Sequence, residues 1–160
     1  MTKENEKKYK FQYTVNICYI INEKGEVLLQ QKARGFGKGN WNGPGGKVEP
    51  DETIEDSVRR EIKEETDLEL GKIKKIAELE FVFMDQNNIN NYCYVFICKD
   101  FRGKERNTGE GKLKWFKKEE IPYEEMWDDD KYWLNDALNG KFIKKRFCFE
   151  KNKVKNIINL

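Results

Sequence analysis

One helix-forming segment with an unusual distribution of charge constrains this chain more than any other part. Residues 43–70 read GPGGKVEPDETIEDSVRREIKEETDLEL, a glycine-rich stretch followed by a run of acidic residues. At about 100° per residue, one face becomes an apolar stripe made of Ile54, Val58 and Ile62. Glu61 and Glu65 fall beside this stripe and away from the solvent-facing side. The sequence therefore predicts a helix over residues 52–66 that holds carboxylates against the body of the protein.

The spacing of these carboxylates indicates a bound cation. Glu61, Glu64 and Glu65 are neighbours at i, i+3 and i+4, so they repel one another when ionised and partly desolvated. The chain has no histidine, and oxygen ligands favour Mg²⁺, with Mn²⁺ as the alternative. A divalent ion beside a glycine-rich loop is typical of phosphoryl chemistry. The competing interpretation is that the acids only form a solvated helix face.

Composition narrows the remaining classes of protein. A chain of 160 residues fits one domain over 1–160, with residues 1–9 as a flexible polar lead-in. Lys and Arg number 31 against 29 Asp and Glu, a balance that gives no reason to expect polymeric nucleic acid as a partner. No apolar run approaches the ~18 residues of a membrane span, so no membrane partner is expected. The absence of histidine excludes Ser-His and Cys-His nucleophile systems and His-ligated zinc.

The cysteines indicate a compartment. None of them forms a CxxC pair, and most lie in β-like apolar runs, where reduced and buried cysteine is common; they are Cys18, Cys93, Cys98 and Cys148. We therefore predict inert core thiols in a cytoplasmic protein.

Runs of alternating residues predict a mixed sheet interrupted by two helices. The second helix is expected within WDDDKYWLNDALNGK, with an aspartate at or near its N-cap and Gly140 just past its end. The predicted strands are a hairpin around NEKGE in 11–32, two strands in 73–86 and 91–101 joined by the turn NNINN, a strand in 112–122 ended by Pro122, and a closing strand in 141–152. Residues 33–48 are predicted to be a glycine-rich loop. No GxGxxG or GxxxxGK[ST] phosphate loop is present, so the pattern favours an α/β sandwich over a doubly wound nucleotide fold.

The acidic segment resembles the Nudix box, G-x5-E-x7-R-E-U-x-E-E-x-G-U, where U is a bulky aliphatic residue. The matching positions are Gly46, Glu52, Arg60, Glu61, Ile62, Glu64, Glu65 and Leu68. The chain departs from the motif at Asp67, which replaces a glycine suited to ending a helix with positive φ. Asp tolerates that conformation better than most side chains, so the helix is still predicted to end there.

The resemblance extends over about residues 13–150 and is to the MutT-homologue branch of the Nudix hydrolases, which hydrolyses oxidised purine nucleoside triphosphates such as 8-oxo-dGTP. It implies an α/β/α sandwich with a mixed β-sheet between helices. It also implies Mg²⁺-dependent release of the nucleoside monophosphate and pyrophosphate, a nucleotide-pool sanitation activity. A monomer acting on a small nucleotide is the expected form.

The resemblance also implies roles for individual residues. The metal would be held by Glu61, Glu64 and Glu65 with a backbone carbonyl near Gly45, and Glu110 would approach it from a loop. The general base would be Glu64 or Glu110, and Arg60 would support the carboxylates. The residues expected to bind substrate are Lys32, Phe36, Asn42, Phe81, Phe83, Trp127, Asp129 and Asp130. Ordinary N-capping remains the alternative for the aspartates, and core packing for Phe81 and Phe83.

Three alternative functions stay open. The first is a Nudix hydrolase of another nucleoside diphosphate derivative, such as ADP-ribose or a dinucleoside polyphosphate. The second is a non-catalytic nucleotide- or RNA-binding module with the same fold. The third is an interaction domain in which the acids only solubilise a helix.

Overall fold

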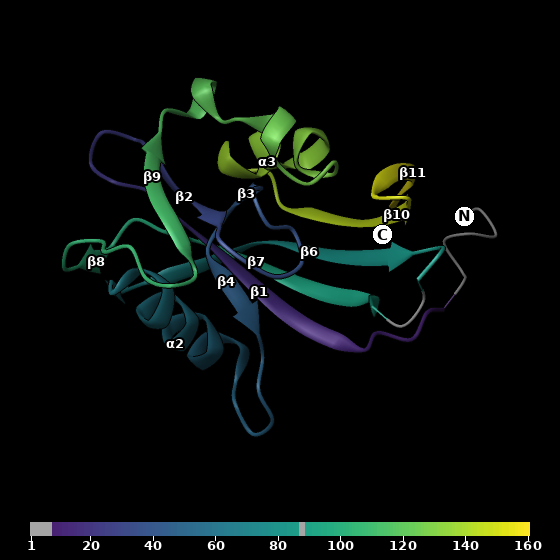
Figure 1. The fold of residues 1–160 in the computed structure, drawn as a ribbon, viewed down its shortest axis with the longest axis horizontal. Helices are drawn as coiled ribbons and strands as arrows, with labels where there is room; N and C mark the ends of the chain where they lie inside the picture. Colours follow the sequence, from purple (N-terminus) through teal and green to yellow (C-terminus); the bar gives the residue numbers. More distant parts are fainter. Residues whose placement is uncertain (1–7, 87–88) are drawn as a thin grey trace.

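A twisted six-stranded mixed sheet forms the centre of the molecule (Figure 1). The computed structural model describes residues 8–86 and 89–160. In spatial order the main sheet consists of β11 (Lys153–Asn159), β10 (Ile143–Glu150), β6 (Ile73–Phe83), β7 (Asn91–Cys98), β1 (Tyr13–Ile20) and β4 (Gly45–Lys47). Two smaller sheets contain β3 (Trp41–Asn42), β2 (Val27–Lys32) and β9 (Gly111–Phe116), and β5 (Glu69–Leu70) with β8 (Phe101–Arg102). The pairs β10–β6 and β7–β1 are parallel and the other pairs of the main sheet are antiparallel, so the predicted mixed sheet is confirmed.

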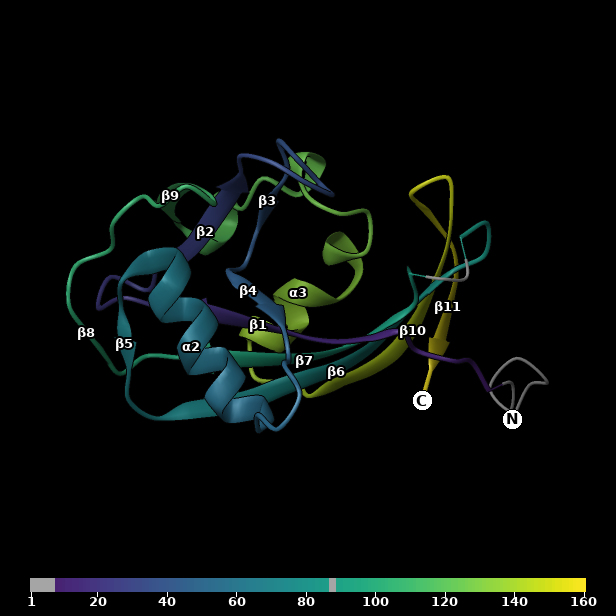
Figure 2. The same ribbon diagram turned by 60° about the horizontal axis from the view of Figure 1, so that its bottom comes forward.

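Two α-helices cover opposite faces of this sheet, as expected for an α/β/α sandwich (Figures 1 and 2). Side chains alternate along a strand, and in β1 Cys18 and Ile20 pack with α2 (Ile54–Thr66) while Tyr19 packs with α3 (Asp130–Leu138). Two hydrophobic cores therefore lie on the two sides of one sheet. The α3 side is the more aromatic, with Trp133, Phe147 and Phe149 almost completely buried.

Helix α2 is the helix predicted from the acidic segment, with a slightly later start. Thr53 caps its first turn, because the Thr53 side-chain oxygen accepts a hydrogen bond from the Asp56 N–H at 3.1 Å. At the other end, Asp67 adopts a left-handed conformation with φ 66° and its N–H bonds to the Lys63 carbonyl. Asp67 thus ends the helix in the conformation that the glycine of the motif would supply.

The predicted hairpin of residues 11–32 is wrong in its pairing. The turn itself forms, with Gly25 at φ 78° and the Asn22 N–H bonded to the Glu26 carbonyl. Beyond a single bridge between Ile21 and Val27, however, β1 joins the main sheet and β2 joins the three-stranded sheet. Pairing of β2 with β9, 80 or so residues later, outweighs the local hairpin.

The segment predicted as one glycine-rich loop contains two short strands. β3 pairs with β2, and β4 pairs with β1, so residues 41–47 join the two sheets. Gly45 makes this possible because a Cβ there would lie 2.0 Å from the Asn16 carbonyl oxygen. The glycine is required by the close approach of two backbones.

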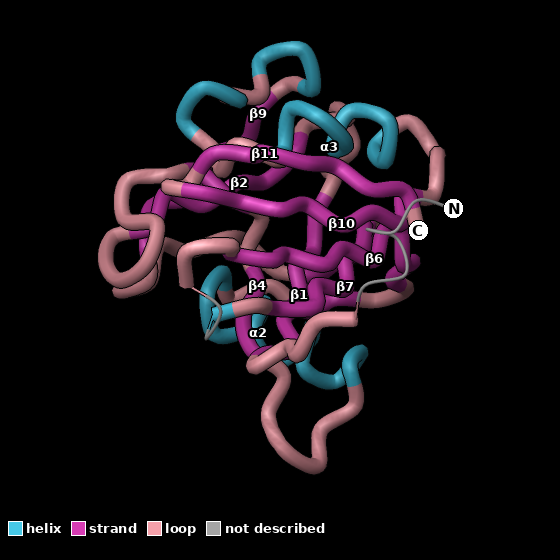
Figure 3. The backbone as a smooth tube through the Cα atoms, turned by 90° about the vertical axis from the view of Figure 1, so that its right-hand side faces the viewer, coloured by secondary structure: helices cyan, strands magenta, loops and turns pink. Residues whose placement is uncertain are grey.

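The C-terminal region differs from its prediction in one strand. β10 is the late strand expected in 141–152, but β11 follows it and forms the edge of the main sheet (Figure 3). Lys151 and Asn152 form the two-residue turn between them with φ of 52° and 64°, a conformation that favours asparagine. Upstream, β9 ends at Phe116, and the 3-10 turns η2 (Lys118–Glu120) and η3 (Tyr123–Glu125) separate it from α3, so Pro122 does not end the strand.

The remaining predictions for the fold concern the turn between β6 and β7, the thiols and the membrane. β6 and β7 pair as expected, but residues 87–88 of the NNINN turn and residues 1–7 of the lead-in lie outside the described residues. All four cysteines are buried. Within the described ranges, neither α-helix combines the length and apolar character that crossing a bilayer requires.

Candidate active site

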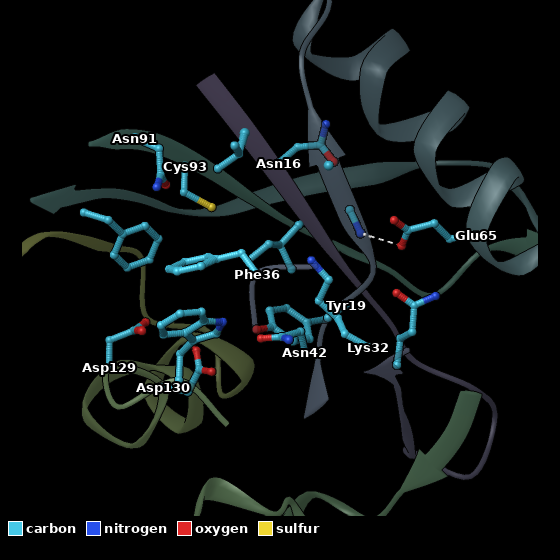
Figure 4. Close-up of a pocket in the computed structure, with 18 of the residues that line it drawn as sticks. Asn16, Tyr19, Lys32, Phe36, Asn42, Glu65, Asn91, Cys93, Asp129 and Asp130 are labelled. Atoms are coloured by element: carbon cyan, nitrogen blue, oxygen red, sulfur yellow. Dashed lines mark hydrogen bonds between the residues drawn. The ribbon is translucent and has the colours of Figure 1, made fainter. Parts of the chain in front are cut away.

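The carboxylate of Glu65 lies where α2 meets the glycine strand β4. Glu65 is only 9% exposed, and its Oε2 accepts a hydrogen bond from the Gly45 N–H at 3.2 Å (Figure 4). Burial raises the pKa of Glu65 to about 8; the bond from Gly45 opposes the rise, and the carboxylates of Glu61 and Glu110 add to it. The Gly45 contact uses its N–H, so the proposed carbonyl ligand remains a prediction.

Glu61 lies one turn earlier on the same edge of the apolar stripe. Its side chain is 15% exposed, and a Cβ on Gly46 would lie 2.3 Å from the Glu61 carboxyl carbon. Only glycine at position 46 leaves room for this carboxylate. Burial raises the pKa of Glu61, opposed by the neighbouring Arg60 and reinforced by Glu64. The structure thus places Glu61 and Glu65 beside the buried stripe, where the helix periodicity predicts them.

Arg60 gathers the acids of this helix into one ion-pair cluster. Its guanidinium contacts Glu52 at 2.6 Å, Glu61 at 2.9 Å and Glu64 at 3.3 Å. It also donates to the Lys47 carbonyl at 3.1 Å, which ties the helix to β4. The hydrogen bond from Arg60 lowers the pKa of Glu52 to about 2. Arg60 therefore positions carboxylates, while Glu64 itself remains 58% exposed.

Glu110 reaches the same region from the turn before β9. It forms an ion pair with Arg34 at 3.0 Å, and both side chains are substantially exposed. A depression of about 470 Å³, which we call the carboxylate cleft, is lined by Arg34, Glu61, Glu64, Glu65, Thr108, Gly109 and Glu110. The cleft thus brings together the four glutamates predicted to hold the metal.

The donor set of the cleft fits a hard divalent cation, although the acids do not yet converge on one point. Among residues 8–86 and 89–160, no three acidic, cysteine or histidine side chains lie close enough together to hold a metal ion in their present rotamers. The reason is visible in their partners: Arg60 holds Glu61 and Glu64, Arg34 holds Glu110, and the Gly45 N–H holds Glu65. Crowded carboxylates with raised pKa values and oxygen donors alone suit Mg²⁺ or Mn²⁺.

A second hollow, which we call the aromatic cavity, adjoins the cleft and has a volume of about 280 Å³. Its wall includes all eight residues predicted to bind substrate, namely Lys32, Phe36, Asn42, Phe81, Phe83, Trp127, Asp129 and Asp130. Glu65 and Glu110 line both hollows. Figure 4 shows Asp129, Asp130 and Phe36 at one end, Glu65 at the other, and Asn42, Tyr19 and Lys32 between them. Lys32 is the last residue of β2 and lies just before the loop that carries Phe36.

Two buried aspartates mark the closed end of this cavity. Asp129 and Asp130 are 3% and 5% exposed, and the Trp133 indole N–H donates to Asp129 Oδ2 at 2.7 Å. Asp129 occupies the N-cap position of α3 but makes no side-chain capping bond, so simple N-capping does not explain the pair. Burial raises the pKa of Asp129 to about 6, and burial with the adjacent Asp129 charge raises the pKa of Asp130 well above its ordinary value. The pair is therefore more stable with a shared proton than as two adjacent buried charges.

Aromatic rings form the walls around these acids. The Phe36 ring lies 4.9 Å from the Trp127 ring, and Phe83 stacks on Phe149 at 5.1 Å. Phe36 is 56% exposed and sits on the loop between β2 and β3, so one side of the cavity is formed by a surface residue. Phe81 and Phe83 face the cavity from one side of β6, so they line a hollow as well as packing in the core.

Several cavity residues were not predicted from the sequence. They are chiefly Asn16, Tyr19, Gln30, Asn91, Cys93 and Phe149. The alternation of β1 could have indicated Tyr19, since Val15, Ile17 and Tyr19 lie on the same side of that strand. Nothing local in the sequence indicates Gln30 or Cys93, because their positions depend on how β2 and β7 pair with distant strands.

Similarity to known proteins identifies the family of this chain. The family model described as the NUDIX domain matches residues 10–137. An oxidized purine nucleoside triphosphate hydrolase of Danio rerio is 36% identical over 82% of this chain and 83% of its own length. The protein of that name from Mus musculus is also 36% identical, over 81% of this chain and 80% of its own length. The chain belongs to the Nudix family.

Solved structures support the same assignment. A MutT protein from Bacillus halodurans superposes with a TM-score of 0.78 at 26% identity, covering 91% of this chain and 95% of that protein. The match includes the mixed sheet between two helices. Nudix enzymes act on small nucleotide substrates and require divalent cations, and four glutamates of this chain line the carboxylate cleft.

Proposed function

We propose that this chain hydrolyses oxidised purine nucleoside triphosphates, such as 8-oxo-dGTP, to the nucleoside monophosphate and pyrophosphate, with Mg²⁺ as its cation. The observation that carries the proposal is a cavity with two buried aspartates at one end and the carboxylate cleft at the other, joined by Glu65 and Glu110. The names of the Danio rerio and Mus musculus relatives support the same substrate class.

The aspartate pair suits an oxidised purine. Guanine presents an acceptor at N7, whereas 8-oxoguanine presents an N7–H donor. Because burial raises the pKa of both aspartates, the pair would hold one proton and offer an acceptor carboxylate and a donor carboxylic acid side by side. An edge that carries both a donor and a carbonyl acceptor satisfies both groups, and an unmatched edge leaves a buried polar group unpaired. Trp127 and Phe36 supply faces against which the purine would stack.

The cleft would handle the triphosphate. Glu61, Glu64 and Glu65 would hold Mg²⁺, with contributions from the Gly45 carbonyl and Glu110. When bound, the ion neutralises phosphate charge and lowers the pKa of a water nucleophile. Lys32 stands near enough to Glu65 to lower its pKa, and its ammonium would bind a phosphate oxygen. Arg60 would orient Glu61 and Glu64 without touching the substrate.

The general base that takes the proton from the attacking water would be Glu64 or Glu110. Both side chains are about half exposed, and each is held by an arginine that a rotamer change would release. Either can therefore reach a water in the cleft. The products, a nucleoside monophosphate and pyrophosphate, define the bond that breaks, which lies between the α- and β-phosphates.

We also propose a monomer that works in the cytoplasm on the nucleotide pool and not on polymeric nucleic acid. The burial of all four cysteines in the core supports a reducing compartment. A net charge of +2 gives no general attraction to polyphosphate chains such as DNA or RNA.

A substrate panel tests the proposal. Purified protein with Mg²⁺ would be given 8-oxo-dGTP, dGTP, ADP-ribose and a dinucleoside polyphosphate, with Glu61→Gln protein as the control. We expect pyrophosphate and 8-oxo-dGMP from the first substrate at the highest kcat/KM. Hydrolysis of ADP-ribose to two monophosphates, or release of inorganic phosphate, would identify a different Nudix reaction. Magnesium-independent binding with no turnover of any compound would indicate a binding module.

A further inference from the structure

Gln30 is a buried polar residue whose amide lacks a partner. It is 4% exposed, it lines the aromatic cavity, and its Nε2 has no hydrogen-bond partner in the described part of the chain. Two other buried side-chain atoms there share this state, Asn16 Oδ1 and Tyr123 Oη. Asn16 already donates through its Nδ2 to Ser57 at 2.8 Å, so its amide is partly satisfied. An unpaired buried donor destabilises a fold, and such a group in a cavity wall is typical of a site that a ligand completes.

The strand register places Gln30 at the end of the cavity nearer Glu65 and Glu110, away from the two aspartates. Gln30 and Lys32 are two apart in β2, so their side chains point to the same face. Across the sheet, Lys32 pairs with Gly111, and Glu110 is the residue next to it. A Cβ on Gly111 would lie 3.0 Å from Gln30 Cγ, which shows that the Gln30 side chain leans toward this turn.

The space for the Gln30 amide depends on the glycine opposite. A Cβ at Gly111 would also lie 2.1 Å from the Gln31 carbonyl oxygen, so no other residue fits there without moving the backbone. The bare backbone at position 111 leaves room that the longer Gln30 side chain enters. The long polar side chain of Gln30 thus occupies space that is open because Gly111 has no side chain.

The chemistry of this wall indicates what it would bind. Gln30 and Lys32 offer an amide donor and an ammonium donor on one face, and Glu65 and Glu110 complete this part of the cavity. Phosphate oxygens accept hydrogen bonds, and a metal ion in the cleft would neutralise part of their negative charge. We infer that Gln30 is a specificity-determining residue whose side-chain amide donates a hydrogen bond to a phosphate oxygen of the bound nucleotide. The inference rests on the proposed function for the presence of a polyphosphate.

The test compares two neighbouring glutamines. Gln30→Met keeps the side-chain length and removes the amide, and Gln31→Met is the matched control, because Gln31 does not line the cavity and its amide donates to the Gly39 carbonyl. Calorimetry would measure binding of inorganic tripolyphosphate with Mg²⁺. A separate titration would measure binding of the nucleoside 8-oxo-2′-deoxyguanosine. Thermal unfolding without metal gives a readout independent of ligand.

We expect Gln30→Met to weaken tripolyphosphate binding about tenfold, since a hydrogen bond to a charged oxygen is lost. Nucleoside binding should not change, and the melting temperature should stay equal or rise because an unpaired amide is removed. Gln31→Met should leave tripolyphosphate and nucleoside binding as in the wild type.

Three results would overturn the inference: unchanged tripolyphosphate affinity in Gln30→Met, a loss confined to the nucleoside, or a wild-type protein that does not bind tripolyphosphate. A lower melting temperature with unchanged tripolyphosphate affinity would give Gln30 a structural role only. If the wild type binds tripolyphosphate and Gln30→Met weakens it, but 8-oxo-dGTP is not hydrolysed, then the proposed substrate fails and the role of Gln30 stands.

Discussion

The two hollows of this protein share Glu65 and Glu110 but are built in different ways. In the aromatic cavity the two aspartates are buried, and the Trp133 indole holds Asp129 in place. In the carboxylate cleft Glu64 and Glu110 are about half exposed, and each is held by an arginine side chain. The cavity is therefore preformed, whereas the cleft requires its acids to exchange partners before they can meet on a cation.

Because of this difference, rearranging the carboxylate cleft requires less free energy than rearranging the aromatic cavity. Exposed ion pairs stabilise a protein by only about 0–1 kcal/mol each, so releasing Glu64 or Glu110 from its arginine costs little. Repacking the rings around Asp129 would cost much more, since core side chains sit in fixed rotamers. Under the proposed function, a cation would organise the cleft while the shape of the aromatic cavity stays constant.

The largest expected effect comes from removing a carboxylate of the cleft. Glu61→Gln and Glu65→Gln should each lower kcat about 10³-fold, because the stabilisation of phosphate charge in the transition state is lost. Glutamine at position 65 can still accept the Gly45 N–H, so the fold should persist. Steady-state kinetics and thermal unfolding measure both quantities. Glu55→Gln, on the exposed first turn of α2, is the control. Full activity in both site variants would remove the metal assignment.

A smaller effect, confined to substrate preference, is expected in the cavity. Asp129→Asn should change the ratio of kcat/KM for 8-oxo-dGTP over dGTP by at least about tenfold, because an amide alters the donor and acceptor pattern that meets the base. The Mg²⁺ concentration for half-maximal rate should stay the same. Asp136→Asn in the same helix serves as the control. An unchanged ratio would mean that the base is recognised elsewhere.

The aspartates also predict opposite pH dependences of stability within three consecutive residues. Burial and the charge of Asp129 hold the pKa of Asp130 above its ordinary value, so the fold favours the protonated form. Stability from this group is complete below about pH 4 and is lost as pH rises toward the folded pKa. Asp130→Asn should therefore melt increasingly above the wild type between pH 4 and pH 8. Melting temperatures of Asp130→Asn and the wild type, measured at intervals across this pH range, check the direction of the change.

Asp128 provides the matched comparison for this pH series. Burial opposes its ionisation, but the Val154 N–H at 2.8 Å and Lys131 at 3.0 Å outweigh burial and hold its pKa below the ordinary value. Its stabilising contribution is present above pH 4 and is lost as pH falls through the folded pKa. Asp128→Asn should be less stable than the wild type at pH 7 and equal to it in acid. Parallel curves for the two variants would contradict the assigned protonation states.

The smallest effect is expected at the outer edge of the cleft. Arg34→Gln removes the exposed partner of Glu110, and an exposed pair contributes about 0–1 kcal/mol, so kcat should change by no more than about fivefold. The melting temperature should stay within about 3 °C of the wild type. A loss of activity comparable to that of Glu61→Gln would show that Arg34 contacts the substrate and that the cleft is more rigid than the ion pairs indicate.

Local patterns predicted the parts of the molecule that local interactions determine. The periodicity of α2 placed Glu61 and Glu65 beside the apolar stripe, and Asp67 ends the helix in the left-handed conformation expected of it. The resemblance to the family then supplied eight of the residues that line the cavity. It could not supply their protonation states, which depend on burial.

The features that the sequence did not predict depend on long-range pairing. β1 and β2 separate because β9 competes for β2, and this competition brings Gln30 into the cavity. The partners of Arg60 and Arg34 are equally hidden, since several acids lie within reach of each arginine and only the folded geometry selects among them. β11 was missed because its alternating pattern is weak and its turn relies on two non-glycine residues with positive φ.

Because Glu65 lies on the boundary of both hollows, the distance from the aspartates to the carboxylate cleft is fixed by the fold. A nucleotide whose base is seated against the aspartates would bring its phosphorus atoms to a fixed distance along the cavity, level with the carboxylates. A base that does not reach the aspartates would leave the phosphorus atoms displaced from the attacking water. Selectivity among nucleotides would therefore appear in kcat as well as in binding affinity.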